Sequence, residues 1–487
     1  MSLNSFIKKM RDITRLDQGI NGDAQRIEQL TWMLFLKIYD DKEYDWEAVD
    51  DDFKSIIPEQ CRWRNWADTV SGKALKGDAL IQFVDVTLLP TLKNLPIPAN
   101  CPRYQSIVKT VFTDIHNFMK DGVLLRQLIS EINTCDFNDP ADAHAFGAIY
   151  ETILKLLQSA GSSGEFYTPR ALTDFMARHV GLKIGETVAD FACGTGGFLN
   201  SARSLLAGQA KTNAQRVKLS QSFYGMEKKP LPYLLCVTNL LLNGVDEPYI
   251  TYGNALTKST GDYTEADKFD VILMNPPYGG SEQDIILQNF PANLRSAETA
   301  DLFLILIMAR LKAKGRAAVI IPDGFLFGGG NKAEIKRELL QNFNLHAIVR
   351  LPTSVFSPYT PIATNVLFFD GTGPTEATWF YRVDMPEGYK HFSKTKPMLL
   401  EHLADLDAWW DNRQPLEQNG ADKARKYRAE ELQALQYNFD LCGFPQEEEE
   451  ILPPAELIAR YKAERARHEQ VMDDALAKIL SMLGGQA

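Results

Sequence analysis

The residues Asn275-Pro276-Pro277-Tyr278 carry the most specific chemistry in the sequence, and they directly follow an apolar run at 269–274. Because two successive prolines fix φ and remove backbone donors, the Asn275 side chain and the adjacent carbonyls form a rigid array of acceptors. Such an array suits an amino nitrogen conjugated to a ring, since accepting both amino hydrogens favours positive charge on that nitrogen as it attacks a methyl group. Tyr278 offers a flat face for stacking. The structural alternative is a rigid turn after a strand.

A glycine-rich segment, DFACGTGGF at 190–198, stands where an expected strand ends and an expected helix begins. Glycines let the backbone turn sharply, and a helix N-terminus offers N–H groups to an anionic group. Nicotinamide and flavin enzymes use similar turns, but the GxGxxG pattern fails here because Leu199 occupies its last position. Asp190, four residues before Gly194, is placed to meet the ammonium of an amino-acid ligand.

Two further segments stand at expected strand or helix ends. Glu227 closes the run 223–227, and an acid at the end of a second strand can accept hydrogen bonds from ribose hydroxyls; the alternative is a surface glutamate without a role. GEFYTPR at 164–170 precedes an expected helix. There, Thr168 followed by Pro169 predicts an N-cap with proline at the first helical position, and the neighbouring aromatic and polar groups can also line a ligand pocket.

The elements that position these residues alternate between strand and helix from about residue 160. Seven apolar runs predict strands at 187–192, 223–227, 249–252, 269–274, 316–321, 346–350 and 365–369. Amphipathic stretches predict helices at 169–180, 197–206, 231–242, 300–311 and 332–341. This alternation predicts an α/β fold with a doubly wound, mostly parallel seven-stranded sheet. The motifs fall at the carboxyl ends of its strands, where such sheets bind ligands.

Helical regions are expected on both sides of this sheet domain, which we assign to 156–390. Residues 1–155 form the first, because apolar residues recur at helical spacing in 27–38 and 146–157. After about residue 390 we expect no strands, so 391–487 is the second. It includes an acidic, proline-containing linker and a charged helix at 455–483 with Met472, Ala475, Ile479 and Leu483 on one seam. That helix either packs on its own domain or binds a partner.

Composition restricts the class of protein. With 487 residues, 45% hydrophobic and 24% charged, the chain has the make-up of an ordinary globular protein. Its start lacks the apolar core of a signal peptide, and its apolar stretches are too short to span a bilayer, so no membrane segment is expected. The six cysteines include no CxxC pair, so we expect neither a disulfide framework nor a metal site, and a cytoplasmic location.

The formal net charge of −11 is unfavourable for a protein that would hold DNA alone, because nonspecific duplex binding rests on neutralising phosphates with Lys and Arg. Either a more basic partner or a local basic face can supply the missing contacts, and the sequence leaves both open.

Taken together, the segments at 190–198, 275–278 and 164–170 resemble the motifs of amino-group DNA methyltransferases, in the gamma order. With the helical first region and a late YNFD segment at 437–440, nearly the whole chain resembles the modification (methylation) subunit of type I restriction–modification systems. The resemblance implies a site-specific DNA adenine N6-methyltransferase that acts on a flipped-out adenine.

The resemblance also implies S-adenosyl-L-methionine as cofactor and assigns roles to residues. Catalysis falls to Asn275, Pro276 and Tyr278, and stacking on the target base to Tyr278 and Phe356. The cofactor-binding set is Glu165, Phe166, Tyr167, Thr168, Pro169, Arg170, Asp190, Gly194, Thr195, Gly196, Gly197, Glu227 and Asn254, where many relatives carry Asp at the last position. The implied partners are DNA, a specificity subunit shared by two methylation subunits, and a restriction nuclease subunit.

Competing interpretations remain at this level. Methyltransferases that act on ribosomal RNA or on a release-factor glutamine also carry NPPY, although they are generally smaller. A non-catalytic scaffold with a methyltransferase fold is the alternative from another class; intact Asp190, Glu227 and Asn275 argue against it. Cytosine N4 as the target atom, the recognition sequence, the oligomeric state, and the preference between maintenance and de novo methylation are not determined by the sequence.

Overall fold

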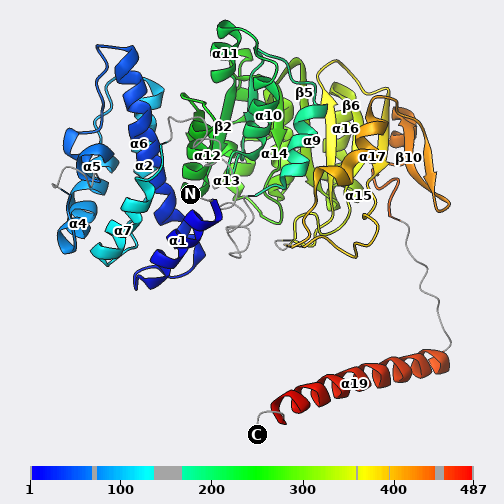
Figure 1. Ribbon diagram of the computed structural model, residues 1–487. Coiled ribbons are helices and arrows are strands. Elements are labelled where there is room, and N and C mark those ends of the chain that lie inside the picture. The colour runs from blue at the N-terminus through cyan, green and yellow to red at the C-terminus, as the bar shows by residue number, and fades with distance from the viewer. Residues whose placement is uncertain are drawn as a thin grey trace. The chain divides into compact units, whose positions relative to one another are not determined.

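The computed structural model describes residues 3–67, 74–136, 167–357, 360–393, 395–444 and 454–484. These residues fall into two units, Met1–Gly443 and Phe444–Ala487. The first unit contains a helical region followed by an α/β sheet, and the second contains one long helix (Figure 1).

The first unit begins with helices, as the apolar spacing predicts. α2 (Asp23–Val49) buries Ile27, Leu30, Leu34 and Ile38 along one side. The other described elements are α1 (Leu3–Leu16), η1 (Glu59–Cys61), α3 (Trp63–Trp66), α4 (Asp78–Gln82), the π-helical η2 (Phe83–Leu88), α5 (Leu89–Lys93), α6 (Arg103–Phe112) and α7 (Gly122–Ile132). The second predicted helical stretch, 146–157, lies outside the described residues.

A single sheet with the strand order β3-β2-β1-β4-β5-β7-β6-β8-β10-β9 forms the rest of this unit. Its first five strands pair in parallel, β7 runs antiparallel between β5 and β6, and β6 pairs in parallel with β8. The strands are β1 (Val188–Asp190), β2 (Phe223–Glu227), β3 (Tyr249–Tyr252), β4 (Phe269–Met274), β5 (Leu311–Pro322), β6 (Asn344–Arg350), β7 (Thr364–Asp370), β8 (Ala377–Arg382), β9 (Leu416–Gln418) and β10 (Ala421–Arg428).

Helices cover both faces of the sheet, so each central strand contributes to two cores. In β4, Val271 and Leu273 pack in one core, and Ile272 and Met274 in the other. The first core includes residues of α9 (Arg170–His179), α10 (Gly197–Ala207), α12 (Pro230–Leu242) and α17 (Ala404–Trp410). The second includes residues of α14 (Thr299–Arg310), α15 (Gly324–Phe327), α16 (Asn331–Asn342) and α18 (Ala429–Ala434). Shorter elements are α11 (Asn213–Ser220), η4 (Ala255–Thr257), η5 (Thr260–Asp262), η6 (Glu265–Asp267), α13 (Asp284–Leu287) and η7 (Leu400–Leu403).

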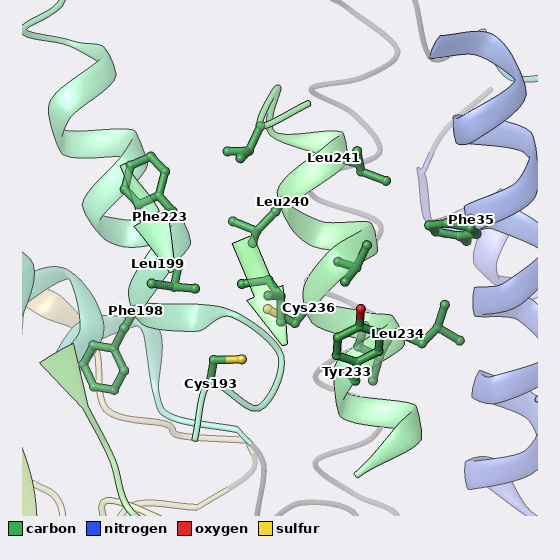
Figure 2. Packing of buried hydrophobic residues seen from close by; sticks show 14 of the residues in the cluster. Phe35, Cys193, Phe198, Leu199, Phe223, Tyr233, Leu234, Cys236, Leu240 and Leu241 are labelled. Atoms are coloured by element: carbon green, nitrogen blue, oxygen red, sulfur yellow. The ribbon is translucent and has the colours of Figure 1, made fainter. Parts of the chain in front are cut away.

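The helical region attaches to the sheet through α2, which contacts α12. Figure 2 shows Phe35 of α2 opposite Leu234 and Tyr233 of α12, and all three belong to the first core. At the edge strand β3, the Tyr252 hydroxyl donates to Asp114 over 2.8 Å. The first core therefore runs continuously from the N-terminal helices into the sheet.

The seven predicted strands correspond to β1–β7; β2, β3 and β4 have the predicted bounds, and the other four shift at their ends. Three expectations were wrong. Among the described residues, the sheet has ten strands rather than seven, and β8 was not predicted. Strands do not stop near residue 390, because β9 and β10 extend the sheet through antiparallel pairing with each other and with β8. The region 391–487 is therefore not wholly helical. The helix expected to reach residue 311 ends at Arg310, and β5 begins at the next residue.

The second unit contains α19 (Pro454–Gly484), which agrees with the helix predicted at 455–483. Large apolar side chains on it are 54% to 69% exposed: Leu457, Ile458, Tyr461, Val471, Met472 and Leu476. The side chains of Ile479 and Leu483, expected on the same seam, lie outside those that the structure describes. In the described part of the chain, no helix combines the length and apolar character needed to cross a membrane.

Candidate functional site

The sheet order brings three of the predicted motifs to one edge. β1 pairs in parallel with both β2 and β4. Asp190 is the last residue of β1, Glu227 is the last residue of β2, and Asn275 directly follows β4. Because parallel neighbouring strands end at the same edge, these three residues share the carboxyl edge of the sheet, where such folds bind ligands.

The turn between β1 and α10 requires its glycines. Gly194 and Gly196 have φ values of 53° and 78°, a region that residues with a side chain rarely adopt. Gly196 is the N-cap of α10, and a Cβ there would lie 2.9 Å from the Cys236 Sγ atom. The turn is thus tight on its inner side and leaves the first N–H groups of α10 at the sheet edge.

The back of the turn rests on α12, through contacts that sequence reasoning missed. The Asn239 side chain donates to the Thr195 carbonyl over 3.0 Å. The Cys193 and Cys236 side chains lie near each other behind the turn, and the neighbouring Cys236 thiol together with burial raises the pKa of Cys193 (Figure 2). Cys236 resembles the other buried apolar residues of α12, so the sequence carried no signal for it, whereas Asn239 is polar within an apolar run and could have indicated a buried contact.

Asp190 and Glu227 are buried carboxylates held by backbone donors. Asp190 accepts from the Ala192 N–H over 3.1 Å, and burial raises its pKa to about 8. Glu227 accepts from the N–H groups of Gly194 and Lys229 over 2.9 and 2.8 Å, and burial raises its pKa as well. The two carboxylates therefore brace the turn, and each gains from a ligand that brings hydrogen-bond donors or positive charge.

The segment Tyr167–Arg170 connects the glycine turn to the corner after β4. Arg170 Nη1 donates to the Gly197 carbonyl over 3.0 Å, and Asn275 Nδ2 donates to Thr168 Oγ1 over 3.1 Å. The segment Thr168–Arg170 therefore bonds to the corner after β4 at one end and to the first residue of α10 at the other. Both predicted motifs border one site.

Thr168 does not act as the predicted N-cap of the following helix. The N-cap of α9 is Pro169, without a side-chain capping bond, and the helix begins at Arg170. The Thr168 hydroxyl accepts from the Asn275 amide. The prediction was wrong by one residue because Pro169 has a non-helical ψ of 131°, so it cannot be the first residue of the helix.

The Asn275 amide has one satisfied end and one unsatisfied end. Nδ2 bonds to Thr168, whereas Oδ1 is buried and has no hydrogen-bond partner among the residues that the structure describes. Pro276 beside it is buried and Pro277 is exposed. A buried acceptor without a donor costs free energy on the order of 1–3 kcal/mol, and a ligand that donates a hydrogen bond there recovers it.

Two aromatic rings meet beside this acceptor. Tyr278 and Phe356 have ring centroids 6.1 Å apart and an interplanar angle of 80°, an edge-to-face contact. Phe356 lies in the segment after β6 and is almost fully buried. Burial raises the pKa of Tyr278, so its hydroxyl stays protonated at neutral pH. The structure thus brings together the two rings predicted to stack on a target base, in contact with each other.

Asn254 lies near the end of β2 and forms a turn. The Gly253 N–H donates to the Glu227 carbonyl over 2.8 Å, and Asn254 Oδ1 accepts from the Leu256 N–H over 3.0 Å to cap η4. Of the remaining predicted residues, Glu165 and Phe166 lie outside the described part of the chain, and Tyr167 packs against the first core. Among the described residues, no group of three or more His, Cys, Asp or Glu side chains is arranged to hold a metal ion.

Comparison with known proteins places this geometry in a family. Residues 141–451 match the N-6 DNA Methylase family, and residues 3–132 match the HsdM N-terminal domain. The chain belongs to the N-6 DNA methylase family. Within it, the chain is 47% identical over 473 residues to the type I restriction enzyme EcoEI methylase subunit of Escherichia coli, which covers 96% of this chain and 95% of that one.

Solved structures agree with this membership. The chain is similar to a modification subunit of a type I restriction enzyme from Vibrio vulnificus, with a TM-score of 0.78, 42% identity, and coverage of 88% of this chain and 92% of that one. A chain from a structural study of complex assembly in a type I R-M system matches with a TM-score of 0.81, 33% identity, and coverage of 98% of both chains. The family resemblance inferred from the motifs is confirmed over nearly the full length.

Proposed function

We propose that this chain is the methylation subunit of a type I restriction–modification complex and methylates N6 of adenine in DNA. The observation that carries the proposal is the Asn275 amide, whose buried Oδ1 has no donor among the described residues and lies at the same sheet edge as the glycine turn. An exocyclic amino group supplies the donor that this oxygen lacks. Family membership and the 47% identity to a methylase subunit support DNA as the substrate.

The residues around the glycine turn fit S-adenosyl-L-methionine. Asp190 is a buried carboxylate beside the N-terminus of α10, an arrangement that suits an amino-acid moiety with one ammonium and one carboxylate group. Glu227 has a position suited to ribose hydroxyls, and Asn254 lies next to it, near where the adenine would follow. The cofactor, when bound, supplies a methyl group already activated by a positively charged sulfur.

The chain's own residues then have three tasks. Tyr167, Pro169, Arg170 and Gly194–Gly197 hold the cofactor against the turn, whereas Thr168 bonds to Asn275. Asn275 Oδ1 and the Pro276 carbonyl accept the two amino hydrogens and so stabilise positive charge on the nitrogen, a preorganised electrostatic effect. Tyr278 and Phe356 stack on the base, which must leave the duplex at a cost of a few kcal/mol; stacking can return about 1–3 kcal/mol. Alignment of the reacting groups contributes most of the rate.

The proposed complex contains more than this chain. Because the net charge of the chain is −11, most of the affinity for DNA comes from a specificity subunit that reads the sequence. Two methylation subunits share each specificity subunit, and a restriction nuclease subunit joins for cleavage. The exposed apolar side chains of α19 offer a surface for such a partner. The structural match to a chain from a study of complex assembly in a type I R-M system supports partners of this kind.

The test is transfer of a radiolabelled methyl group to unmodified genomic DNA by the chain with and without its specificity subunit, followed by digestion to nucleosides. We expect label in N6-methyl-2′-deoxyadenosine and, for Asn275→Ala, a turnover lower by roughly 10²–10³ with cofactor binding retained. Asn342→Ala, at an exposed position at the end of α16, is the matched control. Label in RNA or protein but not in DNA, or near-normal turnover by Asn275→Ala, would contradict the proposal.

A further inference from the structure

The orientation of the Asn275 amide decides whether the corner after β4 accepts or donates a hydrogen bond. An amide carries an acceptor oxygen and a donor NH2 group of nearly the same size. If the side chain turned by half a rotation, Nδ2 would face the ligand in place of Oδ1. The Nδ2 group of Asn275 would then face the amino group of the base, and two donors cannot bond to each other. The reaction therefore requires the orientation in which Oδ1 faces the ligand.

Thr168 bonds to the nitrogen end of this amide. Its Oγ1 atom accepts from Asn275 Nδ2 over 3.1 Å, which leaves Oδ1 buried and without a partner among the described residues. We propose that Thr168 is a positioning residue whose hydroxyl holds the Asn275 amide in place, with Oδ1 facing the target amino group. This inference rests on the proposed function and gives Thr168 a role that does not depend on contact with the cofactor.

The surroundings of Thr168 make its hydroxyl a fixed reference point. The next residue, Pro169, has a restricted φ, and its carbonyl accepts from the N–H groups of Leu172 and Thr173 over 2.9 and 3.2 Å. Arg170 is tied to the Gly197 carbonyl. Because α9 does not use the Thr168 side chain as a cap, the hydroxyl is available to the amide. The segment that anchors the glycine turn therefore also orients the acceptor.

A role through Asn275 and a role through the cofactor predict different kinetics. A cofactor ligand, when removed, weakens cofactor binding. A positioning residue, when removed, lowers kcat and leaves the cofactor affinity unchanged, because the amide then loses the bond that holds it in place. Moreover, a residue that acts only through Asn275 loses its effect once the amide is absent, which a double-mutant cycle measures.

The experiment compares Thr168→Val, Thr168→Ser, Asn275→Ala and Thr168→Val/Asn275→Ala in the full chain assembled with its specificity subunit. Labelled S-adenosylmethionine and unmodified genomic DNA are the substrates, and calorimetry gives the cofactor affinity. For Thr168→Val we expect kcat lower by about tenfold, the scale of one lost hydrogen bond, with cofactor affinity unchanged. Thr168→Ser should restore kcat, and the Val substitution should have no further effect in Asn275→Ala.

Two controls separate this role from a loss of folding. Thr378→Val on β8 also removes a buried, hydrogen-bonded hydroxyl and should leave kcat unchanged, and thermal melting reports the fold of every variant. Equal losses in cofactor affinity and kcat, or the same fractional loss in the Asn275→Ala background, would overturn the positioning role. Wild-type complex that methylates no DNA would instead refute the proposed function.

Discussion

Buried carboxylates occur in both the N-terminal helices and the sheet edge, but their partners differ. In α2, Glu43 and Asp40 accept from Arg62 and Arg64 over 3.0 and 2.9 Å. At the sheet edge, Asp190 and Glu227 accept from backbone N–H groups. Burial raises the pKa of all four. The guanidinium groups of Arg62 and Arg64 compensate the first pair, whereas backbone dipoles hold the second, with the positive charge of Lys229 also acting on Glu227. A buried carboxylate whose charge is compensated within the chain indicates a structural role. One whose charge is only partly compensated indicates a binding site.

The largest expected effect tests the structural pair. Arg62→Met leaves Glu43 buried without its cation, so we expect unfolding free energy lower by about 3 kcal/mol, measured by chemical denaturation. In the folded state the pKa of Glu43 is already raised, and loss of Arg62 raises it further. The variant should therefore lose stability as pH rises above the usual pKa of a glutamate. Unchanged cofactor affinity is the control. An unaltered denaturation midpoint would show that the ion pair is not needed for the helical region.

At the sheet edge, we expect removal of a charged side chain to raise the stability of the ligand-free chain rather than lower it. Asp190→Asn keeps the acceptor for the Ala192 N–H but removes a buried charge, so the ligand-free chain should melt at a higher temperature at pH 8. S-Adenosylmethionine should bind roughly 10- to 100-fold more weakly, as expected for one hydrogen bond to a charged group, measured by calorimetry. A lower melting temperature together with unchanged affinity would contradict the assignment of Asp190 as a ligand site.

The pH dependence of binding sharpens this prediction. The pKa of Asp190 is about 8 in the ligand-free chain, and a cationic ligand prefers its ionised form. Binding below that pKa must release a proton, so affinity should fall by about tenfold per pH unit as pH decreases below the pKa. Calorimetry in buffers of different ionisation enthalpy counts the released proton. Asp190→Asn is the matched control and should remove this dependence. Constant wild-type affinity between about pH 6 and pH 8 would show that Asp190 is not linked to binding.

Removal of all residues after Phe444 is expected to have the smallest effect on melting temperature and cofactor affinity. Both carboxylate pairs lie in the unit Met1–Gly443, so the shortened chain should keep the melting temperature and cofactor affinity of the full chain. Capture of the specificity subunit should be lost, because α19 carries the exposed apolar side chains. Co-purification measures the partner, and melting measures the fold. Shortened chain that still assembles would move the partner surface into the first unit.

The central fold could be predicted because its strands are buried and apolar. β2, β3 and β4 begin and end where the sequence predicted. β9 and β10 could not, since β10 alternates only weakly and exposes Arg425, Lys426 and Arg428. These strands form because β8 supplies a free edge, and a pairing partner of that kind is not visible in a local pattern.

The sequence predicted the motifs of the candidate site but not the hydrogen bonds that connect them. Asp190, Glu227 and Asn275 were identified from residue type and position after strands. The bonds from Asn275 to Thr168 and from Asn239 to Thr195 span 107 and 44 positions. Such contacts depend on the order in which strands are laid side by side, which a single sequence does not specify. The same limit explains why Phe356 could be named but its contact with Tyr278 could not.

That edge-to-face contact has a consequence for DNA capture. A base sandwiched between two rings needs about 7 Å between parallel ring planes, whereas Tyr278 and Phe356 touch at 80°. One ring must swing away before a base can enter, at a cost of about 0.5–1.5 kcal/mol for the aromatic contact. Without DNA, the stacking surfaces of the two rings are therefore in contact with each other. A base that stays stacked in the duplex cannot enter between the rings. Only a base that is leaving the helix gains stacking contacts that offset the cost of separating them.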